Sequence, residues 1–131
     1  MTTEKETLRA RWLTRLFVIS PGVTAFEQER RARSKNGDYI TGVHIRCRAL
    51  SEKPDLSGIE SLTVFFLDGN ATVIALSLLP VCEGGWQMYH ALGCPLKAGR
   101  ITGVRVKARY VGSAKCGLMV SVKVRVVSPN T

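Results

Sequence analysis

From Tyr39 to the end of the chain, apolar side chains recur at every second position, with polar or basic side chains between them. The clearest segments are 43–49, 104–111 and 118–127, whose apolar residues share one side of an extended chain. A period of two fits a strand and not a helix, because successive side chains of a strand point to opposite faces. Several such segments separated by turn residues predict a mainly β, antiparallel domain.

Two apolar segments, 62–67 and 71–79, flank the sequence Asp68-Gly69-Asn70. Gly and Asn adopt the positive φ of a tight turn, so this spacing predicts a β-hairpin. The near-continuous hydrophobicity of both segments predicts burial on both faces, in the centre of a sheet or beneath a helix. Residues 86–92, after Gly84-Gly85, predict one further strand.

The strings ITGVHIRCRAL (40–50) and ITGVRVKARYV (101–111) are identical at five positions, four of them consecutive. One interpretation is a doubled strand–loop–strand unit, as in a pseudo-symmetric β-sandwich. The other is that two strands with the same role have similar sequences. Either interpretation predicts that Gly42 and Gly103 lie at bends or bulges, where a side chain does not fit.

The first 19 residues have a different period. Thr3 and Glu6 fit a capping box, and Leu8, Trp12 and Leu16 recur at every fourth position. This pattern predicts an amphipathic helix that ends at residues 20–22, Ser-Pro-Gly. The alternative is that residues 16–19 already form a strand.

Residues 27–38 (EQERRARSKNGD) are highly charged and end in turn formers, which predicts an exposed basic arm or loop. The expected organisation is therefore an N-terminal helix and basic arm over residues 1–38, followed by a β-sandwich over residues 39–131. Within that class we expect a jelly-roll or Greek-key arrangement.

The 131 residues include 19 Lys and Arg against 10 Asp and Glu, a formal charge of +9. Such a balance favours an anionic partner: nucleic acid, an acidic protein surface or anionic lipid. If segments 104–111 and 118–127 pair as a hairpin, their basic side chains share one surface. The alternative is a solvated basic face without a ligand, with Glu27 and Glu29 partly neutralising the arm. The candidate anion-binding residues are Arg30, Arg31, Arg33 and Lys35 in the arm and Arg46, Arg48, Arg105, Lys107, Arg109, Lys123 and Arg125 in the strands.

Motifs for catalysis or metal binding are missing from the sequence. None of the four cysteines forms a C-x-x-C pair, and neither H-E-x-x-H, G-x-S-x-G nor a complete phosphate loop occurs. We therefore expect no enzyme, no metal and no cofactor. No secretory signal is visible and no apolar run approaches the about 18 residues of a membrane span, which predicts an intracellular or virion location.

A basic arm, a compact β-sandwich and the lack of catalytic motifs together resemble small viral or phage shell and decoration proteins. This architectural resemblance implies a non-enzymatic structural protein that self-associates into a larger assembly. Leu8, Trp12 and Leu16 would contact a neighbour, and the basic face would meet nucleic acid or an acidic partner. Two alternatives stay open: a nucleic-acid-binding β module acting alone, and a glycan-binding module that uses Trp86 and Tyr89.

Overall fold

The computed structural model describes residues 8–33, 39–53, 55–78, 86–91 and 101–129. Within these ranges the chain forms strands and no helix, so none of its elements is a helix able to cross a membrane. The strands are β1 (Leu8–Ile19), β2 (Ala25–Arg31), β3 (Tyr39–Leu50), β4 (Ile59–Asp68), β5 (Ala71–Ser77), β6 (Trp86–Ala91), β7 (Gly103–Tyr110) and β8 (Gly117–Pro129).

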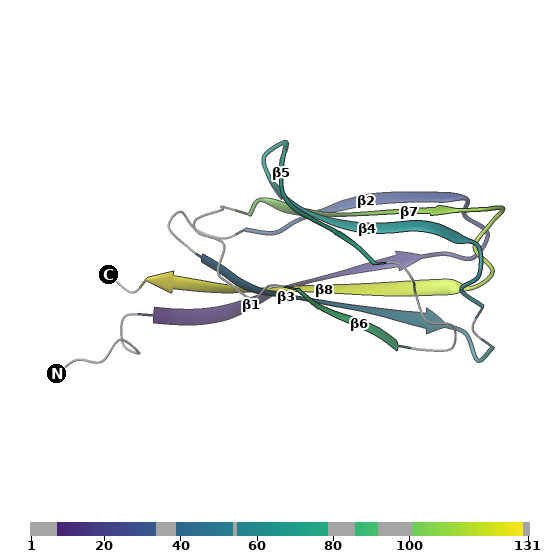
Figure 1. Cartoon of the computed structure of the whole chain (residues 1–131), viewed down its shortest axis with the longest axis horizontal. Coiled ribbons are helices and arrows are strands. Elements are labelled where there is room, and N and C mark those ends of the chain that lie inside the picture. Colours follow the sequence, from purple (N-terminus) through teal and green to yellow (C-terminus); the bar gives the residue numbers. More distant parts are fainter. Residues whose placement is uncertain (1–7, 34–38, 54, 79–85, 92–100, 130–131) are drawn as a thin grey trace.

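The strands form two four-stranded antiparallel sheets that face each other (Figure 1). Sheet A has the order β1-β8-β3-β6, and sheet B has the order β2-β7-β4-β5. The first strand pairs with the last, the second with the seventh, the third with the sixth and the fourth with the fifth. A long antiparallel ribbon folded over itself gives this order, which is that of a jelly roll. The predicted antiparallel β-sandwich is confirmed.

The core lies between the sheets and contains the inward side chain of every second strand position. Phe17 from sheet A and Phe66 from sheet B are the largest fully buried side chains. The alternation predicted for β7 and β8 is confirmed. Their buried residues are Val104, Val106, Ala108 and Tyr110 on β7, and Leu118, Val120, Val122, Val124 and Val126 on β8.

The predicted N-terminal helix is wrong for residues 8–19, which form β1 and pair with β8 along their whole length. A spacing of four is a multiple of two, so Trp12 and Leu16 share one face of a strand as well as one face of a helix. Pairing with β8 favours the strand over the helix, because it buries Phe17 and Ile19 on the opposite face completely. Thr3 and Glu6 lie outside the described residues.

The predicted exposed arm begins too early, because residues 27–31 belong to β2. This strand lies at the edge of sheet B and pairs with β7 from Ala25 to Arg31. Charged side chains are common on edge strands, where they discourage further strand addition. β1 and β2 thus belong to the same two sheets as the strands after residue 38.

The hairpin at Gly69-Asn70 is confirmed, since β4 and β5 pair antiparallel up to Asp68 and Ala71. Gly69 has a φ of +60° in that turn. The predicted burial on both faces is wrong for β5, an edge strand whose residues are exposed or half-buried. A strand over residues 86–91 is also present.

The two ITGV copies lie in β3 and β7, which are internal strands of opposite sheets. Gly42 lies at a register shift between β3 and β8, as predicted. The expectation that a side chain does not fit there is wrong, because the nearest atom to a Cβ atom at Gly42 would be the Arg125 Cβ atom at 3.7 Å. Gly103, by contrast, pairs regularly with Arg31 and with Leu67. A Cβ atom at Gly103 would lie 3.4 Å from the Arg30 carbonyl oxygen, which is an ordinary van der Waals distance, so the predicted bulge that excludes a side chain is wrong at this position.

Candidate functional site

The two sheets differ sharply in charge. The four strands of sheet A contain seven Arg and Lys residues and no Asp or Glu, whereas the strands of sheet B contain five basic and four acidic residues. The excess positive charge of the sandwich is therefore concentrated on sheet A. Its basic residues are Arg9, Arg11, Arg15, Arg46, Arg48, Lys123 and Arg125.

Four of these residues share the outer face of sheet A on the neighbouring internal strands β8 and β3. Lys123 lies opposite His44, and Arg46 lies opposite Ser121, so the positions are linked by the register of one strand pair. Arg125, Lys123 and Arg46 are each flanked by two buried residues of the opposite face, and Arg48 lies between buried Cys47 and partly buried Ala49, so all four point outward. We call Arg125, Lys123, Arg46 and Arg48 the cationic band.

The cationic band runs diagonally across the sheet. Arg125 and Lys123 are two residues apart on β8, and Arg46 and Arg48 are two residues apart on β3. Lys123 and Arg46 are diagonal cross-strand neighbours. Residues two apart on a strand are about 6.8 Å apart, and diagonal neighbours are about 7–8 Å apart. The four positions therefore form an evenly spaced row about 21 Å long.

Beside the band, the edge strand β1 exposes large apolar side chains on the same outer face. Trp12, Leu16 and Val18 are 48%, 49% and 51% exposed, and we call them the apolar edge. Trp12 lies opposite Arg125, and Val18 lies opposite Met119 on β8. The apolar edge and the cationic band therefore adjoin each other.

The outer face of sheet B has basic side chains too, but acidic residues of β2 lie opposite them. Arg105 contacts Glu29 at 3.1 Å and Glu27 at 3.8 Å. In the strand register, Glu29 lies opposite Arg105 and Glu27 opposite Lys107. The outward basic side chains of β7 therefore have acidic cross-strand neighbours on β2, which offset their mutual repulsion.

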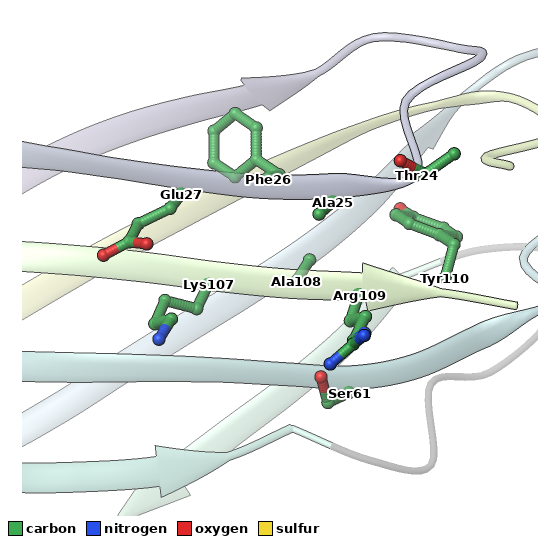
Figure 2. Close-up of a pocket in the computed structure, with 9 residues that line it drawn as sticks. All are labelled: Thr24, Ala25, Phe26, Glu27, Ser61, Lys107, Ala108, Arg109 and Tyr110. Carbon is green, nitrogen blue, oxygen red and sulfur yellow. The ribbon is translucent and has the colours of Figure 1, made fainter.

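A depression of about 590 Å³ lies on sheet B between β2, β7 and β4. Figure 2 shows Glu27, Lys107 and Arg109 projecting from one side of the strands and Phe26 from the other. Lys107, Arg109 and the hydroxyl of Ser61 can donate hydrogen bonds to an anion there. The carboxylate of Glu27 lines the same depression and opposes this attraction.

The predicted basic residues thus lie on two opposite surfaces. The expectation that β7 and β8 form a hairpin is wrong, because they lie in different sheets. Arg46 and Arg48 do extend the basic surface of β8, as the sequence suggested. Of the predicted arm, Arg30 lies on β2 with its guanidinium 5.7 Å from the centre of the Phe17 ring. Arg31 and Arg33 are exposed, and Lys35 lies outside the described residues.

The predicted contact residues Trp12 and Leu16 are exposed, although on a strand and not on a helix. The side chain of Leu8 lies outside the described part of the structure, as do the side chains of Trp86 and Tyr89. The glycan-binding interpretation stays a prediction. Sequence reasoning missed Val18, whose place beside Trp12 and Leu16 follows from a period of two.

The two cysteines in the described ranges are buried. Cys47 and Cys116 carry free thiols inside the core. Burial raises the pKa of Cys47 to about 12, so its thiol stays protonated at neutral pH. Across the described ranges, no group of three or more His, Cys, Asp or Glu side chains is placed to hold a metal ion.

No protein-family model matches the sequence, and no curated protein matches it. Among solved structures, a chain of the cyanophage Pam1 capsid asymmetric unit overlays with a TM-score of 0.56 at 17% identity. That overlay covers 93% of this chain and 85% of the phage chain. The crystal structure of FLHE overlays with a TM-score of 0.52 at 13% identity, over 94% of this chain and 98% of that one. The protein therefore has a capsid-like β-sandwich fold, and at these identities the similarity concerns the fold alone.

Proposed function

We propose that this protein is a non-enzymatic structural subunit that associates with further copies of itself, as a capsid or decoration protein of a virion does. The observation that carries the proposal is the apolar edge, three half-exposed large apolar side chains on one face of an edge strand. The fold supports it, because a chain of the cyanophage Pam1 capsid asymmetric unit has a similar one.

The physical reason is the hydration of the apolar edge. Each Å² of apolar surface removed from water contributes about 25 cal/mol. Leu16 and Val18 are two residues apart and Trp12 is four residues before Leu16, all on the same strand face, so one neighbouring molecule would cover them together. A second copy is the occupant that the shell-like fold favours.

Two copies carrying +9 each repel one another in dilute salt. Salt screens this repulsion while leaving apolar burial intact or stronger. Self-association should therefore increase with salt concentration. Nucleic-acid binding has the opposite dependence, because cation–phosphate contacts weaken as salt rises.

Light scattering at increasing protein and salt concentrations tests the proposal. The expected result is a mass well above the 14.4 kDa of one chain, rising with both variables. The variant Leu16→Ser with Val18→Ser should return the mass to that of one chain. Val111→Ser is the matched control, because Val111 is 69% exposed but follows β7 on the other sheet.

A mass of one chain under every condition, with and without nucleic acid, would contradict the proposal. The same measurement separates it from the second candidate, a nucleic-acid-binding module that acts alone, which the cationic band favours. That candidate predicts one chain of 14.4 kDa at all concentrations and a complex only when nucleic acid is added.

A further inference from the structure

We infer that the cationic band on the outer face of sheet A binds the phosphate backbone of single-stranded nucleic acid, and that the basic residues of sheet B do not. This inference goes beyond the proposed self-association and does not depend on it. It assigns a partner to four of the eleven basic residues that the sequence marked as candidates: Arg46, Arg48, Lys123 and Arg125.

The first support is the spacing of the band. Its positions are about 7 Å apart, which is close to twice the rise of about 3.4 Å per phosphate along one strand of a duplex. Successive basic side chains can therefore reach alternate phosphates of a single strand whose bases stay stacked. A row about 21 Å long on a sheet face suits a linear polymer better than a compact anion.

The second support is the chemistry of the surroundings. The strands of sheet A carry no carboxylate, so none of their residues repels a phosphate chain laid on the band. Three of the four members are arginines, whose planar guanidinium groups donate paired hydrogen bonds to phosphate oxygens.

The third support is the contrast with sheet B. Its outward bases on β7 face Glu27 and Glu29, and Arg105 already contacts both carboxylates. A polyanion there would meet the repulsion of these acids. The location of the charge, and not only its amount, therefore distinguishes the two faces.

The test measures fluorescence anisotropy of a labelled thymidine oligonucleotide of about 20 nucleotides, which is longer than the site of about 4–16 nucleotides that one single-strand-binding β domain occupies. Four phosphate contacts predict a slope of log K against log salt of about −2.8. Arg46→Gln with Lys123→Gln should halve the slope and weaken binding about 25-fold at 0.1 M salt, because each contact contributes about fivefold. Lys107→Gln with Arg109→Gln is the matched control, since it removes the same charge from sheet B and should leave the slope unchanged.

Both pairs are also prepared in the Leu16→Ser, Val18→Ser background, with mass measured in parallel. If self-association is lost in this background and oligonucleotide binding persists, the inference is supported independently of the assembly proposal. The two proposals can then fail separately. The charge-conserving exchange Arg46→Lys with Lys123→Arg should keep the full slope, which ties the loss to the removed charge and not to the change of side chain at these two positions.

Equal losses from the sheet A and sheet B pairs would overturn the inference, because net charge alone would then explain binding. Salt-independent binding, or none, would overturn it as well. Polyglutamate and vesicles of anionic phospholipid serve as competing probes. If either binds more tightly than the oligonucleotide and loses affinity in the sheet A pair, the band belongs to an acidic protein or a membrane surface and the inference fails.

Discussion

The Nε–H of Arg15 on β1 donates a hydrogen bond of 2.6 Å to the carbonyl oxygen of Arg31 on β2. β1 and β2 are the edge strands on the same side of the sandwich, one in each sheet. The same guanidinium donates from Nη1 to the carbonyl oxygen of Thr14, also at 2.6 Å. Exposed carbonyl groups at a sheet edge invite pairing with another chain. Arg15 therefore joins the two sheets and occupies one carbonyl acceptor on β1 and one on β2.

Replacing the Arg15 side chain should weaken the connection between β1 and β2. We expect Arg15→Met to lower the free energy of unfolding by about 1 kcal/mol, because exposed hydrogen bonds contribute modestly. The variant should also aggregate faster, since edge carbonyl groups become available. Urea unfolding and light scattering measure the two effects. Arg33→Met, at an exposed position just after β2, is the control. Equal behaviour of the two variants would refute the role assigned to Arg15.

The ion pair between Arg105 and Glu29 should contribute little to stability. Their side chains are 33% and 51% exposed, so water screens the 3.1 Å contact. A double-mutant cycle with Arg105→Gln and Glu29→Gln should give a coupling energy below about 1 kcal/mol that decreases with salt. A salt-independent coupling above about 2 kcal/mol would show that the pair is desolvated in solution.

Gly58 should tolerate substitution less well than Gly22, although both have a φ near +90°. A Cβ atom at Gly58 would lie 3.2 Å from the carbonyl oxygen of Val111, whereas nothing lies within 4 Å of one at Gly22. The backbone also has to hold the 2.7 Å hydrogen bond that the Val111 N–H donates to Gly58. Gly22→Ala should cost about 1 kcal/mol and Gly58→Ala about 2–3 kcal/mol. Similar unfolding midpoints in urea would contradict this comparison.

The Cys47 thiol should resist alkylation in the folded protein. Burial raises its pKa to about 12, and only the thiolate reacts with iodoacetamide. Mass spectrometry of digested protein should find Cys47 unmodified at pH 8 in native buffer and modified in urea. Raising the pH to 9 should change its labelling little, because the thiol titrates well above that value. Rapid native labelling would mean that the core opens readily around β3.

Several elements were predictable because their patterns are local. The alternation in β3, β7 and β8 predicts strands with one buried face, and Gly69 with Asn70 predicts the turn between β4 and β5. β1 was predicted as a helix because the four-residue spacing of Leu8, Trp12 and Leu16 fits the period of a helix as well as that of a strand. β2 was missed because Glu27 and Glu29 are stabilised by partners about 80 residues away, in β7.

The candidate site shows the same division. The sequence alone determined that the chain is basic, that its later strands carry outward Arg and Lys side chains, and that Trp12 and Leu16 are apolar neighbours. Only the tertiary structure decided which of these residues lie together. Alternation specifies which face of a strand is buried, but it does not specify the neighbouring strand. Because the chain passes from sheet B to sheet A between β7 and β8, their bases lie on opposite surfaces, and pairing of β8 with β3 creates the cationic band.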